Sequence, residues 1–171
     1  MELKSPLHIN AGSESDGMRK TLKIGNLVCI PGSSLKGKLR DNFRKVIDAD
    51  CKLVPGKEQD CDCPVCVIFG GSGYMPSRLN IDNLKPDNTE VNTTIRSTVS
   101  IDRFRKVAKD GALVFSEAID KCVFKGTMQI FFTSETEKYE GHIIIALKMI
   151  DSIGHSKSRG FGFVETEVRK I

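Results

Sequence analysis

Apolar and polar residues alternate in the opening stretch of the chain with a spacing typical of a strand. Leu3, Leu7 and Ile9 lie an even number of residues apart. Side chains at such positions share one face of an extended chain, so the pattern predicts a first strand over 2–10. Pro6 interrupts this stretch and cannot donate a hydrogen bond to a neighbouring strand. We therefore expect an edge strand or a bulge here.

The spacing changes to that of a helix after the turn PGSS at 31–34. A serine hydroxyl can accept the unpaired amides of a first helical turn, which predicts a helix over 34–48 with a hydroxyl N-cap. Its apolar stripe consists of Leu35, Leu39, Phe43 and Val46. Lys36, Arg40 and Arg44 follow at four-residue steps on an adjacent stripe. We expect one stripe to pack and its neighbour to be free to meet phosphate.

The remaining chain divides into a polar middle and a more apolar end. From 49 to 109, Pro, Gly, Asn, Asp and Cys dominate without a long helix signal, which indicates an insertion. Alternation over 121–133 predicts a strand, and a last strand is expected over 161–168. The stretch 139–153 fits a strand by composition and a helix by spacing; its length and the Gly154 that follows favour a helix. This order predicts an α+β, ferredoxin-like (RNA-recognition-motif-like) sheet with two helices and one strand hidden in the middle region.

The length of the chain limits it to one domain with insertions. Its 171 residues are too few for two hydrophobic cores, and 39% apolar with 28% charged residues is typical of a soluble globular protein. The sequence has neither a basic-then-apolar leader nor an apolar run that could span a bilayer. We therefore expect no membrane partner and a cytoplasmic location. There the six cysteines would stay reduced, which favours thiolate ligands over disulfides.

Positive charge is concentrated in one part of a chain whose net charge is only +4. Residues 17–46 contain eight basic residues and a single acid, Asp41, whereas the other residues together are slightly acidic. A local positive field attracts a polyanion to one face of a protein. The alternative is that these side chains simply solvate an exposed surface.

A glycine-rich segment, GHSKSRGFGFVE at 154–165, joins the last predicted helix to the last strand. Glycines let the backbone approach a phosphate, Lys157 and Arg159 can donate to its oxygens, and an exposed aromatic ring can stack on a base. His155 is a further candidate for RNA contact. The alternative is an ordinary loop whose two phenylalanines enter the core.

Four cysteines in the insertion have the spacing C-x9-C-x-C-x2-C: Cys51, Cys61, Cys63 and Cys66. Four thiolates that converge from a loop satisfy tetrahedral Zn²⁺, and the metal supplies folding energy that such an insertion lacks. We therefore expect a structural zinc site, with free cysteines as the alternative. Cys29 and Cys122 have apolar neighbours and are expected to pack in the core.

Two segments taken together carry a resemblance to a known family: IPGSSLKGKLR at 30–40 and SRGFGFV at 158–164. They resemble the signatures of the repeat-associated mysterious protein (RAMP) superfamily, the RNA-recognition-motif-like proteins of CRISPR systems. The segment SIDRFRKVAKDGALVFSEAI at 100–119 and the opening SPLHI narrow the resemblance. The chain is similar to the backbone subunit of a type III CRISPR effector complex, or to a closely related target-cleaving backbone protein.

The resemblance implies a role in antiviral defence. Such subunits polymerise with other copies of themselves along a CRISPR guide RNA, join further effector-complex subunits, and meet a complementary target RNA. The residues that match the guide-binding motifs are Ser33, Ser34, Lys36, Arg40, Lys157, Arg159, Gly160 and Phe161. Contacts from cations and amides suit a filament that must accept any guide sequence.

The resemblance also implies a thumb hairpin that wedges into the guide–target duplex. It would lie over 100–115, within an insertion at about 96–119, while the zinc-binding insertion covers about 49–76. The residues expected at its tip are Arg103, Phe104, Arg105 and Lys106. Apolar and cationic residues together can separate stacked bases and hold nearby phosphates. The alternative is a plain solvated hairpin.

Target-cleaving members require one aspartate between the first strand and the first helix, and Asp16 matches that position. It could bind a divalent cation such as Mg²⁺ beside the scissile phosphate, or align the RNA 2′-hydroxyl. Glu14 lies close by, which leaves open which acid faces the phosphate. The resemblance thus implies a metal-dependent, RNA-guided endoribonuclease. The alternatives are an inactive guide-binding filament subunit and an enzyme that processes the precursor of the guide RNA, using His155.

Overall fold

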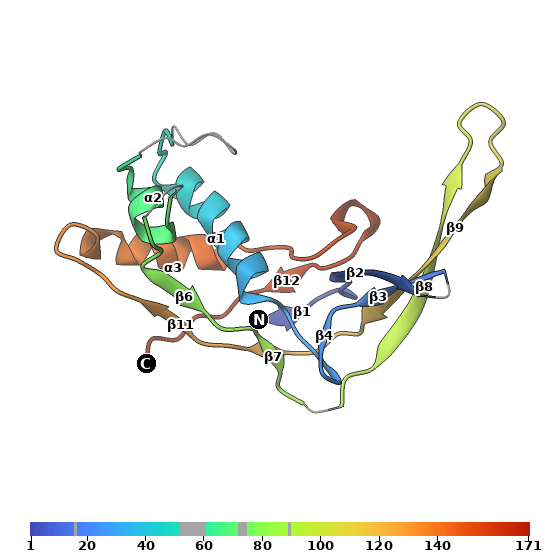
Figure 1. Ribbon diagram of the computed structural model, residues 1–171, viewed down its shortest axis with the longest axis horizontal. Coiled ribbons are helices and arrows are strands. Elements are labelled where there is room, and N and C mark those ends of the chain that lie inside the picture. The colour runs from blue at the N-terminus through green and yellow to red at the C-terminus, as the bar shows by residue number, and fades with distance from the viewer. Residues whose placement is uncertain (16, 52–60, 72–74, 89) are drawn as a thin grey trace.

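Figure 1 shows a body in which the helices gather on one face of a sheet, and a long hairpin that projects from this body. The computed structural model describes residues 1–15, 17–51, 61–71, 75–88 and 90–171. The helices are α1 (Gly32–Val46), α2 (Pro64–Phe69) and α3 (Glu140–Lys148), with the short 3-10 helices η1 (Glu137–Tyr139) and η2 (Lys157–Arg159). The class is therefore mixed α+β, as predicted.

The strands are short except in the projecting hairpin. In the first part of the chain they are β1 (Glu2–Leu3), β2 (Asn10–Ser15), β3 (Met18–Thr21), β4 (Lys23–Ile24), β5 (Leu27–Val28), β6 (Leu79–Ile81) and β7 (Lys85–Pro86). In the second part they are β8 (Thr93–Ile101), β9 (Ala108–Ile119), β10 (Phe124–Lys125), β11 (Met128–Ile130) and β12 (Val164–Glu165).

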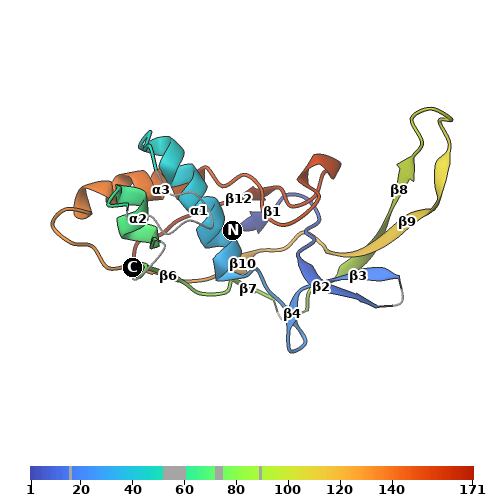
Figure 2. The same ribbon diagram turned by 45° about the horizontal axis from the view of Figure 1, so that its top comes forward.

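Antiparallel pairings join the strands beneath the helices (Figure 2). β12 pairs with one edge of β1. The other edge of β1 meets the chain just before β10, where Glu2 bridges Val123 and the Leu3 N–H donates to Cys122 O over 2.9 Å. β10 pairs in turn with β7, and β11 pairs with β6. The spatial order is therefore β12, β1, then β10 with β11, then β7 with β6.

The strands of the body are shorter than the alternation of the sequence predicts. The expected strand over 2–10 is regular only at β1, because the chain bends at Pro6 and returns to pairing where Leu7 bridges Ile119. The expected strand over 121–133 divides into β10 and β11 at Gly126, which packs so closely under Leu84 that a Cβ would lie 2.9 Å from its Cγ. The strand expected over 161–168 is reduced to β12.

Helix α1 starts two residues earlier than predicted, and no serine side chain caps it. Pro31 occupies the N-cap position, and the N–H of Gly32 donates to Asn83 Oδ1 over 2.9 Å. A side chain from outside the helix therefore satisfies one of the free amides of its first turn. The predicted apolar stripe does pack, since Leu35, Leu39 and Phe43 are buried.

The stretch 139–153 contains the predicted helix, but α3 ends at Lys148. Asn42 of α1 donates from Nδ2 to the carbonyl of Ala146 over 3.1 Å, and Phe43 packs on Tyr139 and Phe69. Phe69 belongs to α2, a short helix that the composition of the insertion did not predict. No helix in the described part of the chain combines the length and apolar character that crossing a membrane requires.

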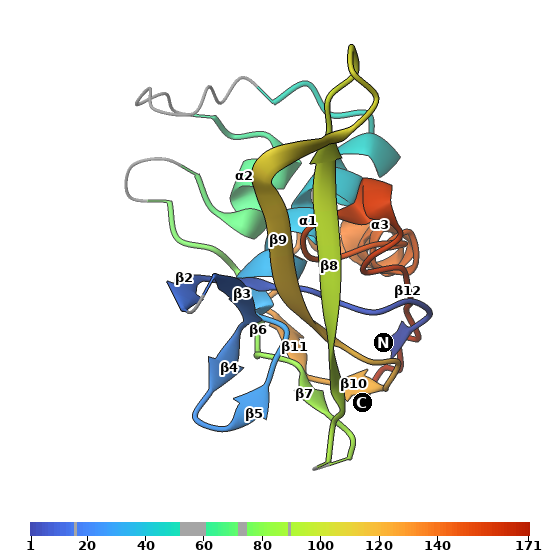
Figure 3. The ribbon, with the colours of Figure 1, turned by 90° about the vertical axis from the view of Figure 1, so that its right-hand side faces the viewer.

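A second sheet, with strand order β2-β3-β9-β8, leaves the body as the projecting hairpin (Figure 3). β8 and β9 pair from Thr93 opposite Ile119 at the root to Ile101 opposite Ala108 near the tip. β3 pairs with β9 in the parallel direction, with Arg19 opposite Ser116. The hairpin predicted over 100–115 thus forms the outer end of a longer one.

Candidate nucleic-acid interface and metal centre

An open groove of about 600 Å³ separates the start of α1 from the loop that precedes β12. Ser33, Ser34 and Lys38 line it from α1, and His155 and Lys157 line it from the loop. Ser33 and Ser34 are exposed, as expected for residues that are not used to cap the helix. The fold therefore brings together two sequence motifs that lie more than a hundred residues apart.

Backbone hydrogen bonds hold the loop of the groove to the segment between β1 and β2. The N–H of His155 donates to His8 O over 2.9 Å, and the N–H of Gly162 donates to Pro6 O over 2.8 Å. Gly162 has φ +71°, and a Cβ there would meet the carbonyl oxygen of Ile153 at 1.9 Å. Only glycine fits this position. The loop is therefore preorganised.

Lys38 was not singled out from the sequence, yet it faces the groove. Its Nζ lies 3.7 Å from Asp151 Oδ1. Burial lowers the pKa of Lys157, and the charge of nearby Lys38 acts in the same direction. Asp151 and Asp41 oppose this shift, so the protein's own carboxylates also lie near the two lysines. The spacing from Ser34 to Lys38, one helical turn, is the signal that could have identified Lys38.

The residues of the predicted basic stripe of α1 have different surroundings. Arg40 is half-buried and its Nη2 lies 3.6 Å from Cys66 Sγ, while the exposed Arg44 lies 3.4 Å from Asp41. Burial lowers the pKa of Lys36, and the charge of Arg40 lowers it further. Among the described residues, several that were predicted to bind RNA do not line the groove: Lys36, Arg40, Arg44, Arg159, Gly160 and Phe161.

The four cysteines of the insertion converge, although they lie up to fifteen residues apart. The Sγ atoms of Cys51, Cys61, Cys63 and Cys66 all lie within 4.8 Å of one another. A tetrahedral metal with Zn–S bonds of about 2.3 Å places its sulfur ligands about 3.8 Å apart, so this donor set fits Zn²⁺. Cys63 is the N-cap of α2 and Cys66 lies in its first turns, which explains how the C-x2-C pair points to one side.

Burial raises the pKa of the Cys66 thiol, and the neighbouring thiols of Cys51 and Cys63 raise it further. Burial likewise raises the pKa of Cys63. A metal must displace these protons to bind, because only thiolates are its ligands. Metal binding at this cluster is therefore expected to weaken as the pH falls.

The tip of the hairpin is an ordered turn built around Asp102. Its Oδ1 accepts the N–H groups of Phe104 at 2.8 Å and Arg105 at 3.0 Å. These hydrogen bonds, from Arg105 and then Phe104, hold the pKa of the Asp102 carboxyl below its usual range. Lys106 completes the turn with φ +55°. Phe104 is 100% exposed, so the turn presents an aromatic ring that the protein itself does not cover.

One face of the hairpin is apolar and exposed over much of its length. Residues paired directly across two strands have side chains on the same face. Val99 lies opposite Leu113, and Ser97 lies opposite Phe115. Ile95 and Ile101 extend this exposed face. These apolar side chains lie outside the core cluster, and exposed apolar patches of this kind are typical of interaction sites.

A family model for the RAMP superfamily matches residues 1–165. The chain belongs to the RAMP superfamily. This RAMP chain is also similar to a protein called CRISPR system Cms endoribonuclease Csm3, from Methanocaldococcus jannaschii. The two are 26% identical over an alignment of 194 positions including gaps, which covers 95% of this chain and 77% of that relative.

Asp16, the predicted catalytic residue of this RAMP chain, lies outside the described residues, and so does the side chain of its neighbour Glu14. The strands on either side of Asp16 are described: β2 ends at Ser15 and β3 begins at Met18. Both belong to the same sheet as the projecting hairpin. The segment that contains Asp16 is therefore linked through one sheet to Phe115, which lies opposite Met18.

Glu117, at the root of the hairpin, is not among the residues singled out from the sequence. Its carboxylate accepts the Thr21 N–H at 3.1 Å and lies 2.7 Å from Lys23 Nζ. Burial raises the pKa of Glu117, but the hydrogen bonds from Lys23 and Thr21 outweigh this and hold the pKa below its usual range. The Glu117 carbonyl also lies 2.7 Å from Nδ1 of the buried His8. Glu117 thus ties the hairpin to the body.

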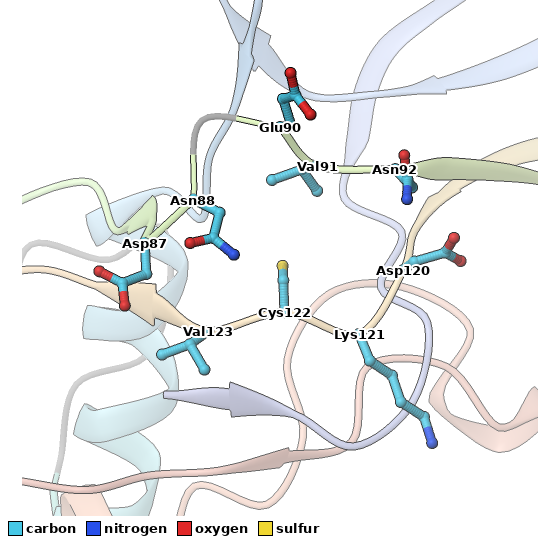
Figure 4. Close-up of a pocket in the computed structure, with 9 residues that line it drawn as sticks. All are labelled: Asp87, Asn88, Glu90, Val91, Asn92, Asp120, Lys121, Cys122 and Val123. Atoms are coloured by element: carbon cyan, nitrogen blue, oxygen red, sulfur yellow. The ribbon is translucent and has the colours of Figure 1, made fainter.

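A second pocket, of about 270 Å³, lies near the root of the hairpin and has the opposite electrostatic character (Figure 4). Asp87, Glu90 and Asp120 line it. Cys122, predicted to pack in the core, is only half-buried and points into this pocket, whereas Cys29 is buried as predicted. Lys121 also lines this pocket and Asp41 also lines the groove, so among the described residues acids outnumber cations in the pocket and lysines outnumber acids in the groove.

Proposed function

We propose that this protein is a guide-RNA-binding backbone subunit of a type III-like CRISPR effector, and that it cleaves complementary target RNA at regular intervals. Membership of the RAMP superfamily and the similarity to a protein named as a CRISPR endoribonuclease support the general role. The groove that joins Ser33 and Ser34 to His155 and Lys157 is the observation that carries the proposal. It combines hydroxyl groups, cations and a preorganised glycine loop at one place.

The fold fits this role. The strands of the body follow the order β12, β1, then β10 with β11, then β7 with β6, and the pairings among them are antiparallel. Helices α1 and α3 lie on one face of these strands. We infer a ferredoxin-like arrangement, in which the segment containing β6 and β7 is the strand hidden in the middle of the sequence. This arrangement places the start of α1 beside the loop that follows α3.

The guide RNA lies in the groove in this proposal, held by its backbone. Lys38 and Lys157 neutralise phosphates, and hydroxyl groups of Ser33 and Ser34 donate to phosphate oxygens. None of these groups reads a base, so binding is independent of the guide sequence. Lys36, Arg44 and Arg159 remain candidates for contacts outside the groove, where an RNA strand continues along α1.

The hairpin meets the guide–target duplex. Phe104 inserts between bases, while Arg103, Arg105 and Lys106 hold the neighbouring phosphates. The exposed turn around Asp102 supports this role because it presents the ring without any cover from the protein. Other copies of this chain and further subunits of the effector occupy the neighbouring sites along the guide.

Asp16 acts on the scissile phosphate of the target. Its carboxylate either holds a divalent cation such as Mg²⁺ or orients the attacking 2′-hydroxyl. The shared sheet of β2, β3, β9 and β8 supports this assignment, because it links the strands on either side of Asp16 to the wedge. The four cysteines hold structural Zn²⁺, which stabilises the insertion when bound.

The decisive experiment compares Asp16→Ala and Glu14→Ala with the unmodified protein in the assembled, guide-loaded effector. We expect Asp16→Ala to abolish regularly spaced target cleavage and to leave guide affinity unchanged. Glu14→Ala is the matched control: it removes the other nearby carboxylate and should leave cleavage unchanged. Undiminished cleavage by Asp16→Ala would overturn the catalytic assignment. Cleavage lost only in Glu14→Ala would move the role to Glu14, whereas cleavage retained by both variants would leave an inactive filament subunit as the function. Cleavage of a repeat hairpin by the protein alone would instead favour processing of the precursor RNA.

A separate measurement tests the groove. Lys157→Ala should weaken guide binding and reduce the slope of log affinity against log salt by about 0.7, the value for one phosphate contact to a single strand. Lys170→Ala is the control, because Lys170 is an exposed lysine that pairs with Glu140 away from the groove. Equal slopes for both variants would contradict binding in the groove.

A further inference from the structure

Arg40 lies in helix α1, and its guanidinium faces the cysteine cluster. Its Nη2 lies 3.6 Å from the Sγ of Cys66, which is 0% exposed. Among the described residues no carboxylate lies within ion-pair distance of the Arg40 guanidinium. Lys36, one turn earlier on α1, is a further cation, and burial and then the charge of Arg40 lower its pKa.

A half-buried guanidinium of this kind needs a negatively charged acceptor. A neutral thiol is a weak acceptor, and a partly desolvated cation without an anion is costly. Four thiolates around a divalent metal carry a net charge of −2, which a neighbouring cation offsets. The contact with Cys66 is therefore favourable when the cluster is deprotonated and holds a metal, and poor when the thiols are protonated.

We infer that Arg40 is an outer-sphere partner of the four-cysteine metal centre, and that its N–H group on Cys66 stabilises the metal-bound thiolates and fastens α1 to the insertion. This role differs from the direct RNA contact that the sequence motif predicts for Arg40. It rests on the zinc site of the proposed function but not on the RNA chemistry, because metal affinity can be measured without RNA.

The test is a titration of the purified full-length protein with Zn²⁺ against a chromophoric chelator, and with Co²⁺ followed by its thiolate charge-transfer absorption. We expect Arg40→Ala to weaken metal affinity about 10–100-fold, as loss of an outer-sphere hydrogen bond does. Arg40→Lys retains the charge without the planar guanidinium, so its metal affinity should lie between those of Arg40→Ala and the unmodified protein. Arg44→Ala is the matched control: an exposed arginine one turn further along α1, with no cysteine contact and an expected affinity equal to that of the unmodified protein.

Several results would overturn the inference. Arg40→Ala and Arg44→Ala could bind Co²⁺ and Zn²⁺ with equal affinity, or Arg40→Ala could lose RNA affinity alone, which would make it a phosphate contact only. If the unmodified protein shows no thiolate charge-transfer absorption with Co²⁺, the cysteine cluster is not a metal centre and the inference fails. If Arg40→Ala does not fold, as circular dichroism would show, the Arg40→Lys variant decides the outcome. Its affinity must then lie below that of Arg44→Ala.

Discussion

The helix-backed body and the projecting hairpin differ in where their apolar side chains lie. Phe43 of the body is 0% exposed and packs on Phe69 and Tyr139, whereas Phe104 of the hairpin is 100% exposed. In the body, packing accounts for the choice of residue. In the hairpin, hydrogen bonds to Asp102 maintain the turn. Packing against the described residues does not account for the aromatic ring of Phe104 at this position. The proposed function supplies an explanation for this ring, because there it contacts RNA.

Phe43→Ala is expected to have the largest effect on the stability of the body. The substitution leaves a cavity where α1, α2 and η1 meet, and should lower the free energy of unfolding by about 3–5 kcal/mol. Denaturant unfolding monitored by circular dichroism measures this difference. A loss below about 1 kcal/mol would contradict the view that this contact forms the core of the body.

Gly162→Ala should have the next largest effect on the body. A Cβ would meet the Ile153 carbonyl oxygen at 1.9 Å, at a backbone φ of +71°. Strain and overpacking together should cost about 2–4 kcal/mol. Gly160→Ala is the control, since its φ is also positive but a Cβ there has no neighbour within 4 Å. Similar unfolding free energies for the two variants would show that the close approach is unimportant.

Glu117 joins the two regions, and Glu117→Gln should cost about 1–3 kcal/mol through the loss of its charged hydrogen bonds. Because the folded pKa of Glu117 lies below its ordinary value of 4.5, its contribution is complete above that pH. The contribution is lost as the pH falls through the folded pKa, when the carboxylate is protonated. Unfolding measured across this pH range should therefore show a smaller acid dependence for Glu117→Gln. An unchanged acid dependence would assign the effect to other carboxylates.

The smallest effect on stability is expected for Phe104→Ala, within about 0.5 kcal/mol of the unmodified protein. Phe131→Ala is the matched control, because Phe131 is also exposed, at 67%, but lies in the body. Under the proposed function only Phe104→Ala changes the cleavage of target RNA by the assembled effector. Equal cleavage by both variants would remove the hairpin ring from the mechanism.

Local patterns in the sequence determined part of this protein. The stripe of Leu35, Leu39 and Phe43 predicted which face of α1 is buried, because helical periodicity depends only on local geometry. The cysteine spacing predicted a cluster of four thiols, and the sequence motifs predicted the family. The glycine-rich loop was also recognised, since Gly160 and Gly162 have backbone angles that other residues rarely adopt.

Only the tertiary structure decided which partners these faces meet. It directed Arg40 to Cys66, placed Lys38 in the groove, and placed Asn83 where it accepts the Gly32 N–H at the start of α1. These partners lie 26 or more residues away in the sequence. Periodicity shows which residues share a face, but the opposing surface arises from distant segments whose packing is decided only when the chain folds.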